Sequence, residues 1–563
     1  MRLTSLLPLL ALPFALACSA ADSDLPIDPQ DQADSTEQAY SGYTANPSLI
    51  LNGQANLEAF SENRDFAVFS VDNGSSPCKS LYLLNTNTAK TTLLTADSFC
   101  PQFYSHPLAV VDTLGQRVAY WTWSETHQTV RLMFWQSGAV PVVVEEQPEQ
   151  AVEGRVKELY FGASHLLYGI PGLNNRFIVK VFNISTGLRS TLSTEVFVGA
   201  EPLFDPTGQS LLLTETNDDD DSILTLYHLA SGSSSVIDSG KQWEVKPSPR
   251  GQFVASQSQC VFEEADVRCR LRLFDWNSQQ VFEAPDADVS KIVGFAADDT
   301  ALAYIAGGKL QIWNLSAGTI DQIPGANTCW AATTPSSSRV VYVTDCNQGS
   351  KGMEGELRVV DLQEPGLPKT LGHRVSPGDN MLVMSRDGNR VAAVRESIPW
   401  TYVDLWTLST GKKESTNMTN GVLYTRFSND GSKFIYAKST ATPGLCAPYY
   451  VCGYLSLRGY DFTRTTLKDQ HIEGSMLAML DLEGMLGNWQ TRPADKSLLQ
   501  SPDGQRMTYS TTNGSATLGS TFVLQSNTLQ NRKVLGNWRP ILITDQYLLV
   551  TSMKGSGVYR VSL

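Results

Sequence analysis

Cysteine is the residue type in this 563-residue chain whose spacing points most directly to a chemistry. One of the nine, Cys18, stands apart near the start, and the other eight fall into close pairs: Cys78 with Cys100, Cys260 with Cys269, Cys329 with Cys346, and Cys446 with Cys452. An even number of closely spaced cysteines is typical of local disulfides in an oxidising compartment. Zinc is the alternative, but there is no Cys-x-x-Cys and no pair has a histidine at zinc-ligand spacing. We therefore predict four disulfides and no metal site.

Histidine is the second residue type that could serve catalysis or bind a metal. The chain has six histidines: His106, His127, His165, His228, His373 and His471. No two lie at metal-ligand helical spacing, and His-Glu-x-x-His does not occur. We expect His228 on a strand and the others in loops, all as ordinary polar residues. The sequence leaves open the alternative that the fold gathers dispersed histidines around a channel.

An acidic run, "NDDDDS" from Asn217 to Ser222, is the one candidate for a hard cation. Calcium would need several oxygen ligands from such a loop. The Asp, x, Asp, x, Asp, Gly spacing of a known calcium loop is missing, which favours a solvated hairpin loop, with calcium binding as the alternative.

The N-terminus begins "MRLTSLLPLLALPFALACSAADSD", in which one Arg precedes a short apolar run. This pattern is typical of an export signal over residues 1–17, because the run is too short to span a membrane. "ALAC" resembles the lipobox of bacterial lipoproteins, with Ala15 where Leu is usual and Leu16 where a smaller residue is usual. The resemblance implies lipidation of Cys18; ordinary cleavage after Ala-Leu-Ala is the alternative.

Residues 18–46 are rich in Asp, Gln, Ser and Pro, with few large apolar residues, which predicts a disordered acidic tether. Ser19, directly after the lipidated cysteine, resembles lipoproteins that are sent to the outer membrane. The expected location is thus the bacterial cell envelope, lipid-anchored at the outer membrane, on its periplasmic or surface face.

Charge and composition exclude some classes of binding partner. The net charge is -14 and the pI is near 5.0, which argues against nucleic acid and anionic lipid because either needs a concentrated basic face. Hydrophobic residues make up 42% of the chain, which excludes global disorder. At this length the chain must hold several domains or a large repeat array.

A turn followed by a strand recurs along the chain. Ser, Asp and Pro favour entry into a turn, Gly supplies a positive φ, and alternating apolar residues then predict the strand. The copies are "DTLGQRVAYW" (112–121), "DPTGQSLLLT" (205–214), "SPRGQFVASQ" (248–257), "SRDGNRVAAV" (385–394), "SNDGSKFIYA" (428–437) and "SPDGQRMTYS" (501–510).

A second strand follows each copy and carries an aromatic residue at one position. These aromatics are Phe134, Phe182, Tyr227, Phe274, Trp313 and Trp406, and we expect them to pack between repeats. Trp121, Trp123, Trp330 and Trp400 fall outside this register. They are either exposed, where they could stack on sugars or anchor a partner, or packed, with Tyr120 and Trp121 on opposite faces of one strand.

The repeat period predicts the fold. Gly208 and Gly251, like Gly388 and Gly431, are 43 residues apart. A period of this length built from strands alone is typical of a β-propeller with four-stranded antiparallel blades. We count about ten or eleven units and predict an all-β fold in two rings, over residues 47–325 and 326–563. The last unit, "GVYRVSL", lacks a strand that "SLILNGQANLEAF" near the start could supply, and closure of one ring by these two would make that even split wrong.

The motifs "SPDG", "SRDG" and "SNDG", each followed by an apolar strand, resemble the WD-repeat-like blades of TolB-type propellers across most of residues 60–563. No Trp-Asp dipeptide closes a blade, which departs from the WD repeat. The resemblance implies a propeller and says little about activity, since such propellers occur in periplasmic interaction proteins, peptidases and polysaccharide lyases.

No catalytic constellation accompanies the repeats. Gly-x-Ser-x-Gly, the nucleophile turn of propeller-linked peptidases, is absent. We predict a non-enzymatic scaffold without a cofactor that binds an envelope protein or polysaccharide and is held to the membrane through Cys18. The competing hypothesis is a propeller-type polysaccharide lyase or hydrolase.

Overall fold

The computed structural model describes residues 47–563, and every regular element in the described residues is a β-strand. The predicted signal peptide, Cys18 and the tether lie outside the described residues. So do 73–77, 101–108, 125–126, 149–156, 173–175, 199–201, 217–221, 241–243, 264–265, 286–287, 350–351, 376–381, 398–399, 419–421, 429, 440–443, 448–449, 464–468, 482–498, 513–517, 527, 535–537 and 553–556.

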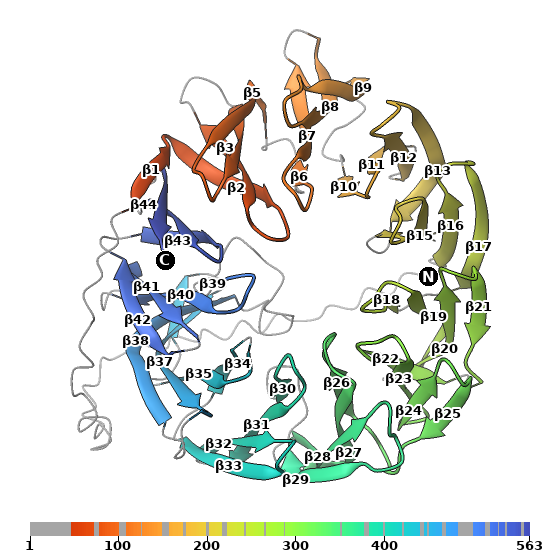
Figure 1. The fold of residues 1–563 in the computed structure, drawn as a ribbon, viewed down its shortest axis with the longest axis vertical. Helices are drawn as coiled ribbons and strands as arrows, with labels where there is room; N and C mark the ends of the chain where they lie inside the picture. Colours follow the sequence, from red (N-terminus) through yellow and green to blue (C-terminus); the bar gives the residue numbers. More distant parts are fainter. Residues whose placement is uncertain are drawn as a thin grey trace, which may run out of the picture. The chain divides into compact units, whose positions relative to one another are not determined.

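Consecutive strands pair antiparallel into four-stranded units, which are propeller blades (Figure 1). The first are β2 (Gln54–Phe60), β3 (Phe66–Asp72), β4 (Lys79–Asn85) and β5 (Thr91–Phe99); β6 (Ala109–Val111), β7 (Arg117–Ser124), β8 (Thr129–Gln136) and β9 (Val142–Pro148); β10 (Lys157–Phe161), β11 (His165–Pro171), β12 (Phe177–Asn183) and β13 (Arg189–Val198); β14 (Leu203–Phe204), β15 (Ser210–Thr216), β16 (Ser222–His228) and β17 (Ser233–Gly240). Next come β18 (Glu244–Pro247), β19 (Phe253–Glu263), β20 (Asp266–Asp275) and β21 (Gln280–Glu283); β22 (Val289–Phe295), β23 (Ala301–Ala306), β24 (Lys309–Asn314) and β25 (Thr319–Gln322); β26 (Trp330–Thr333), β27 (Arg339–Gly349), β28 (Gly352–Asp361) and β29 (Lys369–Val375).

The remaining blades follow the same order. They are β30 (Leu382–Met384), β31 (Arg390–Ser397), β32 (Trp400–Thr407) and β33 (Lys412–Met418); β34 (Val422–Phe427), β35 (Lys433–Ser439), β37 (Tyr450–Asp461) and β38 (Asp469–Asp481), with β36 (Gly444–Ala447) paired to β37; β39 (Leu499–Gln500), β40 (Arg506–Thr512), β41 (Leu518–Gln525) and β42 (Gln530–Val534). The last is β43 (Trp538–Ile543), β44 (Tyr547–Ser552), β45 (Val558–Ser562) and β1 (Ser48–Leu51). Short pairing of β13 with β15, β20 with β22 and β38 with β40 joins some neighbouring blades into larger sheets.

The first described strand completes the last blade. β1 pairs antiparallel with β45, placing Ser48 opposite Arg560. This last blade also packs against the β2–β5 blade at the start of the chain, because Leu542 and Leu549 share a buried cluster with Phe69. The stretch that the sequence marked as able to complete the final unit therefore does so.

The core is continuous around residue 325. Val293 and Ile312, before that residue, share one buried cluster with Ala331 and Val340, after it. The domain boundary at 325 and the number of rings remain predictions.

Two kinds of connection alternate along every blade. Because the strands are antiparallel, the first-to-second and third-to-fourth connections lie at one end of a blade, which we call the turn end. The second-to-third connection and the link to the next blade lie at the other, the loop end.

Hydrogen bonds within the first-to-second turn explain the recurring Ser-x-Asp-Gly. The Ser501 hydroxyl donates to Asp503 Oδ1 at 2.5 Å and accepts from the Arg506 amide at 2.9 Å. The Gly504 amide donates to the Ser501 carbonyl, with a Gly504 φ of +68° that suits glycine. The repeated sequence motif is therefore a turn device and belongs to the fold.

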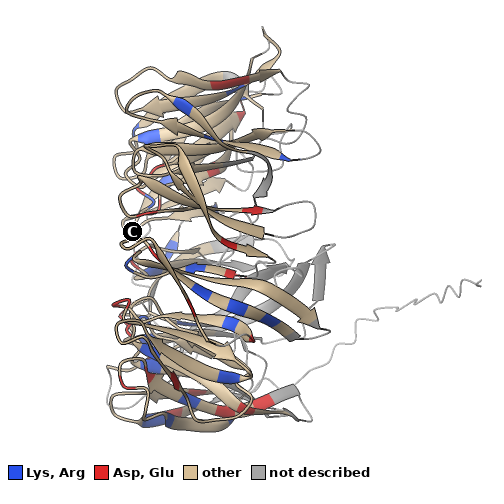
Figure 2. Cartoon of the chain, turned by 90° about the vertical axis from the view of Figure 1, so that its right-hand side faces the viewer, with Lys and Arg blue, Asp and Glu red and all other residues tan. Residues whose placement is uncertain are grey.

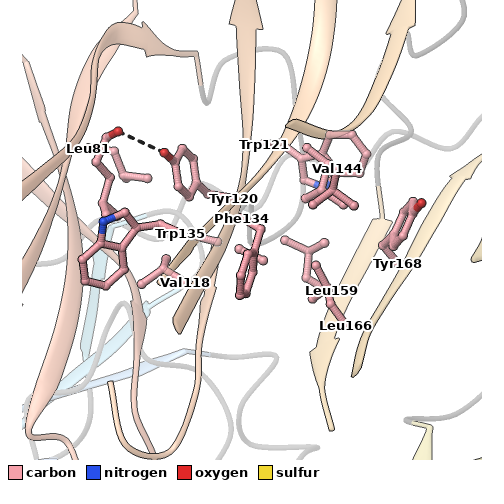
Figure 3. Packing of buried hydrophobic residues seen from close by; sticks show 14 of the residues in the cluster. Leu81, Val118, Tyr120, Trp121, Phe134, Trp135, Val144, Leu159, Leu166 and Tyr168 are labelled. Carbon is pink, nitrogen blue, oxygen red and sulfur yellow. Dashed lines mark hydrogen bonds between the residues drawn. The ribbon is translucent and has the colours of Figure 1, made fainter. Parts of the chain in front are cut away.

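The recurring aromatics pack between blades, as predicted. All six are at most 7% exposed. Phe134 on β8 meets Phe182 on β12 of the next blade, with ring centroids 5.7 Å apart. Figure 3 shows Phe134 beside Val118 and Leu159 in a buried cluster that draws on consecutive blades. Each blade thus buries its faces against its neighbours.

Candidate functional site

The three disulfides in the described side chains all lie at loop ends. They join Cys78 to Cys100, Cys260 to Cys269, and Cys329 to Cys346, which are pairs expected from the sequence. Cys446 and Cys452 stand on the paired strands β36 and β37, but their side chains lie outside the described residues, so their bond remains a prediction.

The β19–β20 hairpin carries one of these disulfides at its base and extends beyond its blade. The neighbouring strands stop short of it, because β18 pairs only as far as Gln257 and β21 only as far as Arg272. A bulge between Ser258 and Val261, with Gln259 at a φ of +51°, redirects β19 before the tip. The tip therefore extends beyond the sheet, and the Cys260–Cys269 disulfide links the two strands at its base.

Two adjacent apolar side chains are exposed on this tip. Val261 is 53% exposed and Phe262 is 49% exposed. Successive strand residues point to opposite faces, so each face of the tip carries one of the two. The register adds Val267 to the Phe262 face and Arg268 to the Val261 face. The Phe262 face is therefore the apolar one, and the Val261 face combines an apolar side chain with a cation.

The β27–β28 hairpin has the same kind of bulge as β19–β20, but its base carries charged side chains. Asp345 takes the positive φ of 55°, and Cys346 bonds back to Cys329. Arg358 joins Asp345 at 3.3 Å and Glu356 at 3.0 Å. Hydrogen bonds from Arg358 and Thr370 lower the pKa of Glu356. The base of this hairpin is thus charged and internally paired.

The structure does not bring the described histidines together. His127, His165, His228 and His373 belong to four different blades. The expectation that all but His228 lie in loops was wrong, because His165 begins β11, His373 lies in β29 and His471 in β38. His106 and the His471 side chain lie outside the described residues. The described residues include no group of three or more His, Cys, Asp or Glu that could hold a metal.

The acidic run lies where a hairpin loop was expected, because residues 217–221 connect β15 to β16. These residues are outside the described part of the chain, so calcium binding remains a hypothesis.

Two of the four tryptophans outside the aromatic register are buried. Trp121 and Trp330 are 1% and 8% exposed, so neither can stack on a sugar. Trp123 is half-buried, and the Trp400 side chain is not among those described.

Tyr120 and Trp121 pack on opposite faces of β7, as one of the two sequence interpretations held (Figure 3). The Tyr120 hydroxyl donates to the Leu94 carbonyl at 3.0 Å. Burial raises the pKa of Tyr120. This tyrosine therefore serves blade packing and stays protonated.

A carboxylate with a raised pKa beside a second carboxylate is the pattern that a catalytic pair would show. Burial, with the nearby Asp503 carboxylate, raises the pKa of Asp545. The Asp503 amide donates to Asp545 Oδ1 at 2.9 Å, and the Arg506 guanidinium donates to the Asp545 carbonyl. The pair thus joins two consecutive turns at the turn end, which accounts for it structurally.

Charge is mixed over the blades. Figure 2 shows basic and acidic residues interspersed along the visible strands. Among the described residues, no helix is both long enough and apolar enough to cross a bilayer.

Comparison with known proteins adds solved structures of low similarity. No family model and no curated protein matches the chain. The tricorn protease shares 12% identity over 87% of this chain and 50% of its own, with a TM-score of 0.26. TolB from Acinetobacter baumannii shares 12% over 56% of this chain and 81% of its own, with a TM-score of 0.23. An oligogalacturonate lyase in complex with manganese shares 12% over 71% and 86%, with a TM-score of 0.27. The match thus spans half of the tricorn protease, and the propeller assignment rests on the blades described above.

Proposed function

We propose that the protein is a non-enzymatic, exported bacterial lipoprotein whose propeller is a rigid scaffold for binding a protein or polymer of the cell envelope. The observation that carries the proposal is the β19–β20 tip, where Val261 and Phe262 are exposed beyond the blade. Rigid apolar anchors of this kind dominate protein interfaces.

The Cys260–Cys269 disulfide supports this function through preorganisation. A hairpin fixed before binding loses less conformational freedom on association, so more of the contact energy appears as affinity. A protein with an apolar pocket for the Phe262 face is the occupant that best matches the tip, and an envelope polysaccharide is the other candidate. The proposed anchor is a lipid on Cys18, joined to the blades by the tether over residues 18–46 at the outer membrane.

The second candidate function is a polysaccharide lyase or hydrolase. It needs several His, Arg, Asp or Glu side chains converging on one site. The described histidines lie on separate blades, and the Asp503–Asp545 pair is part of a turn, which favours the scaffold.

The experiment is a quantitative co-purification from detergent-solubilised envelopes of the host. The test variant is Val261→Ser with Phe262→Ser, and the matched control is Val281→Ser with Phe282→Ser on β21 of the same blade. The control pair has the same residue types and is 40% and 42% exposed. Because loss of an interface anchor weakens binding by about 2 kcal/mol, we expect recovery of one envelope protein to fall at least tenfold in the test variant alone.

Equal recovery with both double variants would contradict a role for the tip. A polysaccharide array treated with the same preparations separates the two functions. Cleavage of an arrayed polymer by the wild-type protein would replace the scaffold proposal with the enzyme.

A further inference from the structure

A cross-blade hydrogen bond recurs at the turn ends. In several blades the first residue of the second strand is Arg, and its guanidinium donates to a backbone carbonyl in the corresponding turn of the next blade. Arg117 reaches the Ala163 carbonyl at 2.8 Å and Arg339 reaches the Gly388 carbonyl at 3.2 Å, and Arg390 and Arg506 bond the Gly431 and Asp545 carbonyls. In these four blades a permanent cation thus ties the turn to that of the next blade.

His165 occupies this position in the β10–β13 blade. It is the first residue of β11, and its carbonyl closes the turn by accepting from the Gly162 amide at 2.8 Å. Its Nδ1 lies 3.2 Å from the Gly208 carbonyl in the turn of the next blade. The tie between these two blades is therefore made by an imidazole in place of a guanidinium.

The surroundings fix this imidazole as neutral. The Asn183 amide nitrogen lies 3.1 Å from His165 Nε2, while Asn183 Oδ1 already accepts from the Ser185 and Thr186 amides. The amide therefore presents a donor, and Nε2 must accept. The ring proton then sits on Nδ1, where it can be donated to Gly208. A second proton on Nε2 would point one donor, Nε2–H, at another donor, the Asn183 side-chain amide, and the hydrogen bond between them would be lost.

The seam between the two blades is close at this point. Gly208 has a φ of +68°, and a Cβ there would lie 2.8 Å from the Ala163 Cβ. At the loop end the same two blades pair through β13 and β15, with Phe197 opposite Thr216 and Val198 opposite Glu215. Between the two ends, Leu167 packs in one buried cluster with Leu211 and Leu213. The His165 bond is thus a polar contact at the turn end of a seam with an apolar centre.

We propose that the seam between the β10–β13 and β14–β17 blades is an acid-sensitive switch, in which protonation of His165 releases the turn of the next blade. This inference does not depend on the proposed function. The hydrogen-bond partners of His165 among the described residues, Ser164, Asn183 and Gly208, are uncharged, so none stabilises an imidazolium.

Charged and titratable groups surround His165 on the neighbouring elements. The Arg117 guanidinium donates to the Ala163 carbonyl in the His165 turn and also pairs with Asp112 at 2.8 Å, so the nearby cation disfavours an imidazolium. Asp205 accepts from Ser210 and Thr207, and His228 on β16 contacts the Ser210 hydroxyl. Arg189 is a further charge on the same blade, at the start of β13.

The direction of the pH effect follows from burial. Burial lowers the pKa of His165, against the raising effect of its bond to Gly208. The open state titrates near the ordinary histidine pKa of about 6.5. The closed seam thus binds fewer protons than the open one, so its stability is complete above about pH 6.5 and falls as the pH drops toward the lowered pKa.

Hydrogen exchange of the purified protein, corrected for intrinsic pH dependence, tests the switch. We expect the opening equilibrium of the turns at 162–165 and 205–210 to rise up to about tenfold per pH unit below about pH 6.5. His165→Arg, which copies the four blades with an arginine at this position, and His165→Gln, which keeps an uncharged donor, should remove the rise. His228→Gln, a control histidine on the same seam, should leave it unchanged.

Absence of the rise in the wild-type protein, or its persistence in both His165 variants, would overturn the proposal. Should neither variant fold, nitrogen NMR of histidine-labelled wild-type protein decides. His165 protonated on Nδ1 alone at pH 6 supports the switch, and a charged imidazolium at that pH would refute it.

Discussion

The two ends of each blade differ in how much they repeat. At the turn end the same hydrogen bonds recur, as in the Ser385, Ser428 and Ser501 hydroxyls that each bond the Asp two residues later. At the loop end the hairpins differ in length, charge and disulfide pattern, as β19–β20 and β27–β28 show. Repetition therefore marks the part that holds the fold, and irregularity marks the part that is free to acquire a function.

The largest loss of stability is expected from a side chain placed at a repeated turn glycine. A Cβ on Gly388 would lie 1.9 Å from Ser337 Oγ and 2.6 Å from its Cβ, whereas one on Gly318 meets nothing within 4 Å, although both have φ near +65°. Both variants to Ala carry the strain of a left-handed residue, about 1–2 kcal/mol. Overpacking adds about 1–3 kcal/mol at Gly388 alone.

Denaturant unfolding of Gly388→Ala and Gly318→Ala measures the difference. We expect Gly388→Ala to be the less stable by about 1–3 kcal/mol. Equal stability of the two would mean that the turns of neighbouring blades are not closely packed.

At the loop end the corresponding change is removal of a disulfide. Cys260→Ser with Cys269→Ser opens a loop with a sequence separation of 9, for which the chain-entropy model gives about 2–3 kcal/mol. Hydrogen exchange should rise in the β19–β20 hairpin and stay unchanged in the turn at 248–252. A uniform rise over the whole blade would contradict the independence of the two ends.

A smaller effect is expected from one turn hydroxyl. Ser428 Oγ donates to Asp430 Oδ1 at 2.6 Å and accepts from the Lys433 amide at 2.9 Å. Ser428→Ala should lower the unfolding free energy by about 1 kcal/mol, since it leaves a buried amide without its acceptor. Thermal unfolding beside Ser432→Ala, a neighbour whose amide donates to Asp430 and whose hydroxyl accepts from Lys433 Nζ at 3.4 Å, gives the comparison. A larger loss in the Ser432 variant would contradict the importance of the Ser428 hydroxyl.

The smallest expected effect concerns acid stability at the turn end. Burial raises the pKa of Asp461, but hydrogen bonds from Lys433 and Thr463 outweigh it and lower the pKa to about 2. The pKa is thus depressed in the folded state, so the contribution is present above the ordinary value of about 3.9 and is lost as pH falls toward 2. Asp461→Asn should flatten the dependence of the unfolding free energy on pH between about pH 4 and 2. An unchanged pH dependence would show that the Lys433–Asp461 pair does not contribute to acid stability.

The sequence was sufficient for the fold because the turn end repeats its own chemistry. "SPDG" predicts a turn by local bonding alone, and the aromatic register predicts packing between neighbouring blades. The disulfide partners followed from proximity along the chain. These features depend on residues a few positions apart, which a single sequence displays.

The loop end could not be predicted to the same depth. Exposure of Val261 and Phe262 depends on where β18 and β21 stop, which no local pattern records. The role of His165 depends on its alignment with Arg117 and Arg390, and the shorter turn before it hides that alignment in the sequence. Both features arise from contacts between elements that are distant along the chain.

Photo-crosslinking in the host envelope can show whether loop ends bind while turn ends hold the blades. A photoreactive phenylalanine would replace Phe262 at the loop end or Leu188 at the turn end, which are 49% and 70% exposed. We expect one discrete envelope component to be crosslinked from position 262 and none from position 188. If the same component is crosslinked from position 188 and none from position 262, the division of roles between the two ends is wrong.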